Sequence, residues 1–210
     1  MKILFLSLAF LTTISASAQD ELEYTVGKGE SPFGAYFDVG FMKRHMSRGS
    51  FGGSFDIEVG GVYRFAPRWF VTLGVAYSGA MNSTYRDSES FDAMGITTNI
   101  SEEVEMASIR IPARVGYDLG PVAFTAGVYW DHLIKGDGIV TTTVGGSSYV
   151  FEGDLTKNKD RDFHRNIPGI SLGMTLLKVV TVEYNFGLVK RDRGVHENFL
   201  RASLGARFFF

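Results

Sequence analysis

Apolar and polar residues alternate with a period of two along most of the chain from Phe33 onward, a pattern typical of β-strands with two unlike faces. In the first such segment, one face carries Phe33, Phe37 and Phe41, and the other carries Gly34 and Asp38. The pattern predicts eight strands, which cover residues 33–42, 55–65, 69–77, 107–117, 122–130, 170–176, 180–188 and 200–210. One face of every predicted strand contains no charged residue.

The connections between the predicted strands alternate in length. Tight turns are predicted after the second, fourth and sixth strands, whereas polar stretches at 79–103 and 135–166, and a shorter one at Lys190–Glu197, follow the third, fifth and seventh. Short turns on one side and long loops on the other are typical of outer-membrane barrels. The sequence therefore predicts an all-β fold, an eight-stranded antiparallel up-and-down transmembrane β-barrel with its apolar faces toward lipid.

One segment leaves the number of strands open. Ile139–Val144 and Tyr149–Phe151 flank Gly145-Gly146-Ser147-Ser148, which indicates a hairpin within the second long connection. The hairpin would either extend the predicted fifth and sixth strands above the membrane or add a strand pair to give a ten-stranded barrel. Aromatic residues near the predicted strand ends fit interfacial girdles; they are Phe65, Trp69, Tyr117, Phe208 and Phe210 at one end and Phe41, Tyr77 and Trp130 at the other.

The first residues have the features of a secretory signal peptide. Lys2 supplies the positive charge, residues 3–11 are apolar, and Ala16-Ser17-Ala18 is a small-residue cleavage site. We expect a signal peptide at residues 1–18, cleaved near Ala18, a periplasmic tail at 19–32 and a barrel domain at 33–210. This organisation predicts a location in the bacterial outer membrane.

Composition narrows the chemistry that this chain can perform. Of the 210 residues, 25 are glycine and 18 are phenylalanine, and there is no cysteine, so disulfides and thiolate metal sites are excluded. The net charge of −2 gives no support for nucleic-acid binding. After residue 18 there is no apolar run of 18 residues, so no transmembrane helix is expected.

The faces opposite the apolar ones carry charges of both signs, which predicts a lumen charge network. Matched signs would remove the cost of placing charges in a narrow lumen, so we expect a side-chain plug, with a conducting pore as the alternative. Glu183 and Arg207 are expected to pair, and Arg110 and Arg114 are expected to find acidic partners. The predicted members are Asp38, Asp56, Glu58, Arg64, Arg110, Arg114, Asp131, Glu183, Arg201 and Arg207.

Basic residues gather in two predicted loops that adjoin if the barrel closes. They form a predicted outer-rim basic patch that consists of Lys43, Arg44, Arg48, Lys190, Arg191 and Arg193. Arginine is suited to phosphate groups, so the expected partners are outer-membrane lipid and lipopolysaccharide. The long loops could also contact an extracellular or secretion-system protein.

Two enzymatic or metal hypotheses were weighed on the rim residues. His45, His132, His164 and His196 would all lie at or above the outer rim, but their spacing is not that of metal ligands. Asp131 and His132 could form a hydrolase site with Ser147 or Ser148, although there is no nucleophile motif. We therefore predict no enzyme, no catalytic residue, no metal and no cofactor, with a rim-located outer-membrane hydrolase as an alternative.

Two stretches resemble the PorT-like, porin-family outer-membrane β-barrel domain, a small OmpA-like barrel. They are the run from Ser108 through Tyr117 to Tyr129 and the run from Gly169 through Met174 to Leu188. The chain end is similar to the signal read by the barrel assembly machinery, through Ser203, Gly205, Phe208 and Phe210. This resemblance implies an outer-membrane location and no catalysis, and we expect no peptidoglycan-binding domain.

The function expected from the sequence is a structural or interaction role. The barrel would have a plugged lumen and would contact lipid or a partner protein through its extracellular loops. The alternatives are a small porin, or a barrel associated with transport or secretion.

Overall fold

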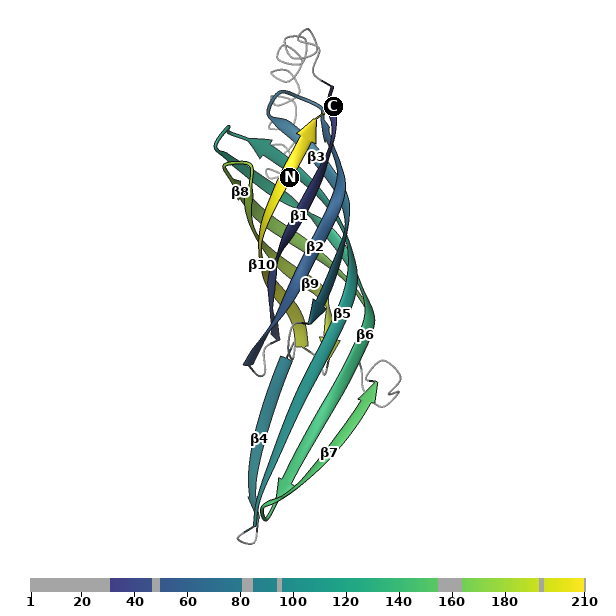
Figure 1. The fold of residues 1–210 in the computed structure, drawn as a ribbon, viewed down its shortest axis with the longest axis vertical. Coiled ribbons are helices and arrows are strands. Elements are labelled where there is room, and N and C mark those ends of the chain that lie inside the picture. Colours follow the sequence, from purple (N-terminus) through teal and green to yellow (C-terminus); the bar gives the residue numbers. More distant parts are fainter. Residues whose placement is uncertain are drawn as a thin grey trace, which may run out of the picture.

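A computed structural model describes residues 31–46, 50–80, 85–93, 96–154, 164–192 and 195–209. The described chain consists of ten strands in one antiparallel sheet (Figure 1). The strands are β1 (Phe33–Met46), β2 (Ser50–Arg64), β3 (Trp69–Ala80), β4 (Tyr85–Ala93), β5 (Ile96–Asp118), β6 (Val122–Val144), β7 (Ser147–Asp154), β8 (Asn166–Leu176), β9 (Val180–Asp192) and β10 (Val195–Phe209). The predicted signal peptide and nearly all of the predicted tail lie outside the described residues.

Eight of the ten strands close into a barrel. Each ring member pairs with its neighbours in the order β1-β2-β3-β5-β6-β8-β9-β10. The ring closes where β1 pairs with β10, in a register that runs from Gly34 opposite Phe209 to Met46 opposite Glu197. The predicted fold, an eight-stranded antiparallel up-and-down barrel, is confirmed by this ring.

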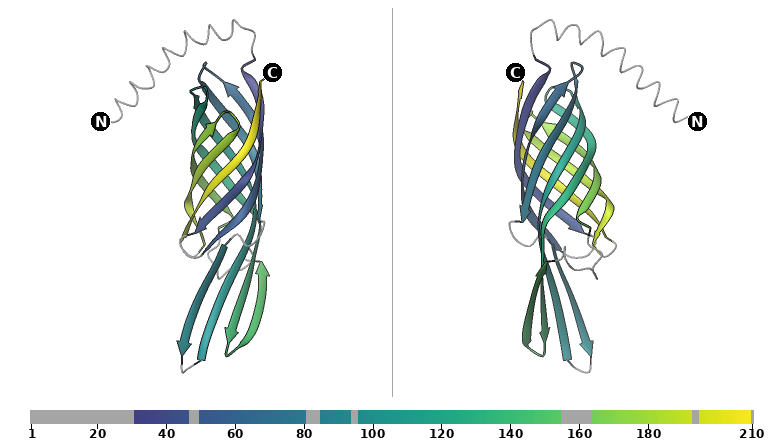
Figure 2. Two further views of the ribbon diagram at one scale, coloured as in Figure 1. Left: turned by 60° about the vertical axis from the view of Figure 1, so that its left-hand side comes forward. Right: turned by 90° about the vertical axis from the view of Figure 1, so that its right-hand side faces the viewer.

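The other two strands, β4 and β7, flank extensions of β5 and β6 in a sheet that projects from one end of the barrel (Figure 2). β5 and β6 are each 23 residues long and continue beyond the ring, where β4 pairs with β5 and β7 pairs with β6. We call β4, residues 96–106 of β5, residues 133–144 of β6 and β7 the projecting sheet. The hairpin around Gly145-Gly146 joins β6, the predicted fifth strand, to the separate strand β7. The predicted extension of the fifth and sixth strands is therefore wrong for the sixth, because the strands that continue beyond the ring are the fourth and fifth, β5 and β6. The ten-stranded barrel is excluded.

The prediction of a loop at 79–103 is therefore wrong for most of these residues, whereas the hairpin predicted within 135–166 is confirmed by β6 and β7. Val104, Met106 and Leu133 are buried at the base of the projecting sheet. Further out, the described side chains on both faces of β5, β6 and β7 are at least partly exposed, so these strands need no apolar face and lack the period-two signal. Gly145 and Gly146 have φ angles of +55° and +88°, the conformation of a two-residue hairpin turn that glycine favours. The run Ile139–Val144 has high β propensity, although aliphatic residues and threonine are mixed on both of its faces.

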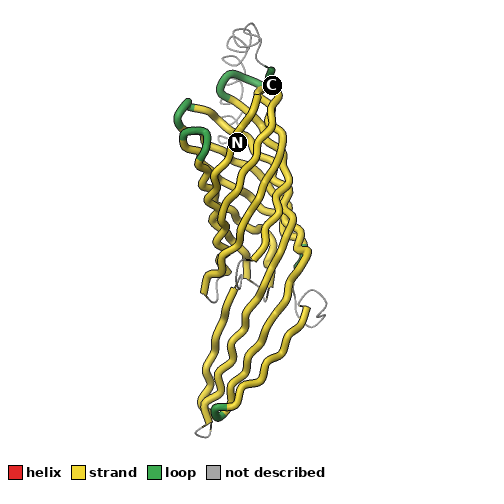
Figure 3. Tube along the Cα trace, viewed as in Figure 1, coloured by secondary structure: helices red, strands yellow, loops and turns green. Residues whose placement is uncertain are grey.

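Within the barrel, buried and exposed residues alternate along the strands. In β1, the side chains of Tyr36, Met42 and Arg44 are buried, whereas Phe37 and Phe41 are exposed, Phe41 by 66%. Charged residues inside and large apolar residues outside reverse the arrangement of a soluble protein and are typical of a barrel that spans lipid. The described chain is built of strands and turns (Figure 3), and none of its elements is a helix that could cross a membrane.

Aromatic side chains cross the lumen face over glycines of neighbouring strands. Phe70 lies opposite Gly116 and Tyr129 lies opposite Gly169. A Cβ atom on Gly116 would lie 2.1 Å from Phe70 Cζ, and one on Gly169 would lie 2.1 Å from Tyr129 Cζ. The rings occupy the space that these glycines leave, which is how large side chains fit inside so narrow a barrel.

Short turns and aromatic pairs mark the barrel end opposite the projecting sheet, which we call the turn end. The C-terminus lies at this end (Figure 2). The connection between β8 and β9 places Leu177 and Lys178 at φ angles of +51° and +61°, a tight two-residue turn. Trp69 contacts Tyr117 and Phe65, with ring centroids 4.8 Å and 6.4 Å apart. These three belong to the predicted girdle; Phe210 lies outside the described residues.

Candidate functional site: the lumen network and the projecting sheet

Six arginines and six carboxylates line the lumen, and we call them the lumen network. The arginines are Arg44, Arg110, Arg114, Arg191, Arg201 and Arg207. The carboxylates are Asp38, Asp56, Glu58, Asp131, Glu183 and Glu197. Nine of these were predicted to face the lumen; the tenth predicted member, Arg64, is half-buried at the end of β2.

Glu58 is the centre of the network. Its two carboxylate oxygens accept hydrogen bonds from Nη1 and Nη2 of Arg114 at 2.5 and 3.1 Å, a bidentate pair. Glu58 Oε2 also lies 3.5 Å from Arg110 Nη2 and 3.4 Å from Arg201 Nη2. The hydroxyl of Tyr36 donates to Glu58 Oε1 at 2.7 Å. One buried carboxylate on β2 therefore joins side chains from three other strands, β1, β5 and β10.

Asp56 is a second carboxylate on β2 that belongs to the same network. It accepts a hydrogen bond from Arg110 Nη2 at 3.1 Å and another from Arg201 Nε. Asp56, Arg110 and Arg201 are all buried. Arg110 Cζ lies over the Phe199 ring, 5.1 Å from its centroid, in a cation–π arrangement. The lumen is thus filled at mid-height by paired charges and an aromatic ring.

A second group of charges closes the lumen at the base of the projecting sheet. Arg44 pairs with Glu197, and Arg191 pairs with both Glu197 and Asp131. Arg44 Nη2 also donates to the hydroxyls of Ser78 and Ser108, each at 2.8 Å. Arg191 Nη1 donates to the backbone carbonyls of His164 and Arg165 at 3.0 and 3.2 Å. The barrel mouth is therefore tied to the segment that enters β8.

These contacts correct the predicted outer-rim basic patch. Arg44 and Arg191 were expected to face outward, but both are buried in the lumen network. The reason is that β1 and β9 continue past their predicted ends, so the inward side of the alternation reaches both arginines. Lys43 and Lys190 are exposed on the outer surface, and Arg48 and Arg193 lie outside the described residues.

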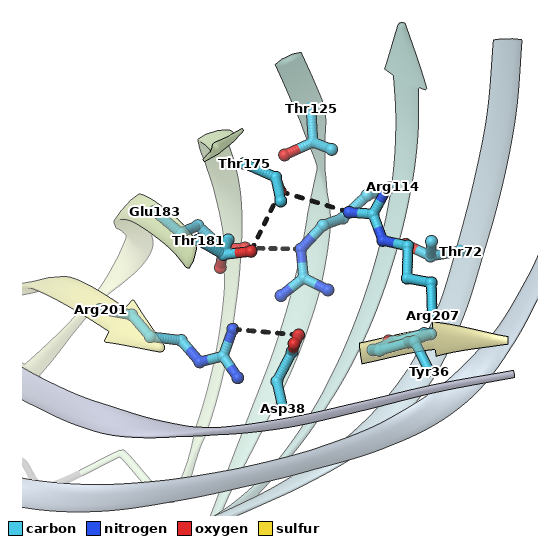
Figure 4. A pocket seen from close by; sticks show the side chains of 10 residues that line it. All are labelled: Tyr36, Asp38, Thr72, Arg114, Thr125, Thr175, Thr181, Glu183, Arg201 and Arg207. Carbon is cyan, nitrogen blue, oxygen red and sulfur yellow. Dashed lines mark hydrogen bonds and ion pairs between the residues drawn. The ribbon is translucent and has the colours of Figure 1, made fainter. Parts of the chain in front are cut away.

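The turn end of the lumen contains a small polar cavity (Figure 4). Its volume is about 20 Å³, enough for roughly one water molecule. Four threonine side chains contribute to the wall, together with charged members of the lumen network and Tyr36. Thr175 and Thr181 lie within hydrogen-bond distance of each other, 3.0 Å between hydroxyl oxygens. A space of this size is a pocket in a filled lumen rather than a channel.

The predicted pairing of Glu183 with Arg207 is wrong. Glu183 pairs with Arg114 Nε at 2.6 Å, and Arg207 donates to the Thr175 hydroxyl at 3.2 Å while it covers the Phe70 ring. β9 pairs with β10 only as far as Leu204, so Arg207 lies beyond the end of that pairing. The prediction that Arg110 and Arg114 find acidic partners agrees with their contacts to Asp56 and Glu58.

The rim residues do not form the hydrolase site that was weighed as an alternative. Asp131 points into the lumen and binds Arg191, whereas His132, the next residue, is exposed and contacts Asn166 Oδ1 through Nδ1 at 2.7 Å. Ser147 begins β7, roughly 40 Å further along the sheet at about 3.3 Å per residue. The structure thus separates the three side chains that a Ser-His-Asp site would need.

Across the residues that the structure describes, no group of three or more His, Asp or Glu side chains could hold a metal ion. His196 Nδ1 instead contacts the backbone carbonyl of Gly187 at 2.9 Å.

The projecting sheet has an unusual balance of charge. It carries nine acidic and two basic residues. The acidic residues are Asp87, Glu89, Asp92, Glu102, Glu103, Glu105, Asp137, Glu152 and Asp154, and the basic ones are Arg86 and Lys135. Lys135 Nζ lies 2.8 Å from Asp137 and 3.6 Å from Glu105. The hydrogen bond to Asp137 raises the pKa of Lys135 above its usual value.

The two edges of the projecting sheet differ. β4 carries three acidic residues and pairs through Tyr85 and Arg86 with two residues of β2. β7 pairs with β6 alone among the described strands. Its centre is apolar, and the side chains of Tyr149, Val150 and Phe151 are 56%, 59% and 64% exposed.

Several residues of the network were missed by the sequence analysis. Glu197 was placed in a loop, yet β10 begins at Val195 and points Glu197 inward. Tyr36 and Tyr129 face the lumen. Each lies two residues before a lumen-facing aspartate, Asp38 or Asp131, and this spacing in the sequence could have placed both tyrosines on the lumen face. Of the predicted assembly signal, Ser203 is buried in the lumen and Phe208 is exposed on the outer face.

Gly205, a further residue of that signal, lies beside the closing seam. A Cβ atom there would approach Asp38 Oδ1 to 1.5 Å, so the close passage of β10 past β1 requires glycine at this position.

No family model matches the sequence, and no curated protein sequence matches it. Among solved structures, the chain is similar to Ail, the attachment invasion locus protein of Yersinia pestis, in complex with the heparin analogue sucrose octasulfate. The identity is 12%, the match covers 84% of this chain and 99% of Ail, and the TM-score is 0.43. At this TM-score, the fold assignment rests on the closed ring of strands described above.

Two other solved structures are similar over most of their length. Neisserial surface protein A matches with 16% identity over 86% of this chain and 98% of its own, with a TM-score of 0.44. The translocator domain of the autotransporter NalP from Neisseria meningitidis matches with 13% identity over 95% of this chain and 98% of its own, with a TM-score of 0.22.

Proposed function

We propose that this protein is a bacterial outer-membrane barrel whose lumen does not conduct and whose task is to hold the projecting sheet outside the cell for contact with a partner. The observation that carries the proposal is the continuity of β5 and β6. Both strands run from the closed barrel into the projecting sheet and stay paired with each other, with one β-bulge between Ala107 and Ser108. A rigid sheet on a membrane-anchored barrel is suited to binding, because loops and strands displayed on a fixed scaffold commonly carry recognition.

The membrane location is supported by the outer surface of the barrel. Large apolar side chains are exposed on every ring strand, among them Val59, Leu73, Ile111, Phe124, Leu172 and Leu204. So large an apolar surface would be unstable in water, whereas lipid favours it. The resemblance of the sequence to PorT-like barrels and the features of a signal peptide at residues 1–18 support the same location.

A closed lumen is supported by the pairing of its charges. An open pore would expose the lumen side chains to water, but Arg110, Arg201, Glu58 and Glu183 are each about 1% exposed or less. Removing charges from water is costly unless they are paired and hydrogen-bonded. The paired network therefore favours a plug over a small porin or a transport barrel.

The orientation can be tested by cysteine labelling, because the natural chain has no cysteine. Ser148→Cys places a thiol near the tip of the projecting sheet, and Leu177→Cys places one in an exposed turn at the opposite end. In intact bacterial cells, a membrane-impermeant maleimide should label Ser148→Cys and spare Leu177→Cys.

Permeabilising the outer membrane provides the control, since both variants should then be labelled. Labelling of Leu177→Cys but not Ser148→Cys in intact cells would contradict the proposed orientation. Labelling of neither variant in intact cells would contradict display outside the cell.

A further inference from the structure

The outer edge of β7 has the properties of a strand that is completed by another polypeptide. Val144 and Ser147 flank the two-residue turn and lie opposite each other, so they form a hydrogen-bonded pair. Because alternate residues of a strand point their backbone groups to opposite edges, those of Ser148, Val150 and Glu152 face away from β6. No described strand lies on that side.

Natural proteins usually protect such an edge with charges, proline or a covering segment. The opposite edge of the projecting sheet follows this rule, because β4 carries Asp87, Glu89 and Asp92 and touches β2 at its base. β7 follows it only in part, because its charges, Glu152 and Asp154, lie at one end and no described segment covers its outer edge. Tyr149, Val150 and Phe151 form an exposed apolar run at the centre of the strand, a sequence with high β propensity.

Charge identifies the kind of strand that fits this edge. The projecting sheet has nine acidic and two basic residues, and β7 itself ends with Glu152 and Asp154. A second copy of this chain would bring an equally acidic sheet to the edge, so repulsion disfavours pairing between copies. A basic segment would be attracted and would find a carboxylate directly across from its cation.

The register shows which side chains an added strand would meet. Tyr149 and Phe151 share one face of the sheet with Thr142 and Val140, and Val150 and Glu152 share the other with Thr141 and Ile139. An added strand would place apolar residues beside Tyr149 and Phe151 on the first face. It would place a basic residue beside Glu152 on the second.

We propose that β7 binds an extended, basic segment of another protein by strand addition, with apolar and basic residues alternating along that segment. Main-chain hydrogen bonds to Ser148, Val150 and Glu152 would supply affinity, and the alternating side chains would supply specificity. The inference rests on the proposed function, because it requires the projecting sheet to be accessible outside the cell.

The test uses the refolded full chain in a zwitterionic detergent and a fluorescent peptide of alternating lysine and valine, about as long as β7. Fluorescence anisotropy should report binding of this peptide and no binding of a matched glutamate–valine peptide. Val150→Pro removes the outward N–H without changing the charge, and proline is tolerated on the free side of an edge strand. Its affinity for the basic peptide should fall about tenfold or more.

Two further variants separate strand addition from general attraction. Val150→Thr keeps the N–H and the β propensity and should bind like the natural chain. Glu152→Lys should weaken binding of the basic peptide by about tenfold. Equal affinity in Val150→Pro and Val150→Thr would overturn strand addition, because binding would then depend on charge alone. Dimers of the natural chain that Val150→Pro abolishes would assign the edge to a second copy and overturn the basic partner.

The labelling experiment distinguishes failure of this inference from failure of the proposed function. Correct labelling of Ser148→Cys in intact cells together with no peptide binding would overturn the strand-addition inference alone. Labelling from the wrong side would overturn the proposed function and, with it, the accessibility that the inference requires.

Discussion

Every cation of the lumen network is an arginine, and the geometry explains the choice. A guanidinium is planar and offers several donors in a fixed fork, so one side chain can satisfy two carboxylates at once. Arg114 does so by pairing with Glu58 and Glu183 from opposite sides of the lumen. Arg191 likewise joins Asp131 to Glu197. A lysine has three donors on a single nitrogen, so it could not match the bidentate geometry of these pairs.

At this scale the account predicts a strong dependence on Glu58. Glu58→Ala would remove the carboxylate shared by Arg110, Arg114 and Arg201 and leave buried positive charge without its partner. The free energy of unfolding should fall by about 3–5 kcal/mol. Urea unfolding of the folded protein in lipid vesicles, followed by tryptophan fluorescence, measures this change.

The matched control removes a carboxylate of the same type from the surface. Glu105 lies 3.6 Å from Lys135 in the solvent-exposed part of the sheet, where ion pairs contribute little to stability. Glu105→Ala should therefore unfold like the natural chain. Equal stability of the Glu58→Ala and Glu105→Ala variants would contradict a lumen held together by its charges.

At the scale of the strands, the pairing of aromatic residues with glycines sets how closely the barrel can close. Phe70 fills the space beside Gly116 on the neighbouring strand. A methyl group at Gly116 would lie 2.1 Å from Phe70 Cζ, so the ring would have to move in a lumen that has little spare volume. The glycines of the lumen face are thus part of the packing of the barrel.

This packing predicts different effects for two glycine substitutions. Gly116→Ala should destabilise the barrel by about 1–3 kcal/mol through overpacking. Gly61→Ala should be neutral, because a Cβ atom there would meet nothing closer than the backbone oxygen of Gly34 at 3.9 Å. The folded fraction of each variant can be measured by the mobility of unheated samples on gels. A Gly116→Ala barrel that folds as completely as Gly61→Ala would contradict the packing described.

The strands of the barrel could be predicted from the sequence because lipid and lumen impose unlike faces on them. Phe37, Val39 and Phe41 face outward and alternate with lumen-facing Asp38 and Gly40, so the period of two is plain. The same signal fades where both faces meet water, and this explains why β4 and the outer half of β5 were predicted as a loop. The outer half of β6 and β7 could be predicted as a hairpin only because two glycines mark their turn. Arg44 was misplaced for a related reason, since Lys43 beside it makes that segment polar on both faces.

The partners within the lumen network were harder to predict than its members. The alternation shows which side chains point inward, but contacts across the lumen join strands that are not neighbours. Glu58 on β2 meets Arg114 on β5, which in turn meets Glu183 on β9. Such contacts depend on how far each strand is staggered against the next. The alternation of residues along one strand does not determine this stagger, so the pairs across the lumen could not be predicted from it.

At the scale of the whole molecule, the barrel and the projecting sheet have different surface properties. The barrel has apolar residues outside, which suits it to lipid, and paired charges inside, which is the basis for the proposal that it does not conduct ions. The projecting sheet has faces of mixed polarity, a strong excess of acidic residues and one edge along which no described strand lies. The long strands β5 and β6 join the two parts into one sheet, so the position of the exposed edge is fixed relative to the membrane.

The measurement that tests this account most directly is the conductance of the refolded mature protein in a planar lipid bilayer. Flotation with vesicles and the shifted mobility of unheated samples on gels would first establish that the protein is inserted and folded. The account predicts no steady conductance, because the lumen network fills the barrel from Arg207 at the turn end to Arg191 at the base of the projecting sheet. Steady single-channel currents that change in Arg110→Ala or Glu183→Ala would contradict it and would make this protein a small pore.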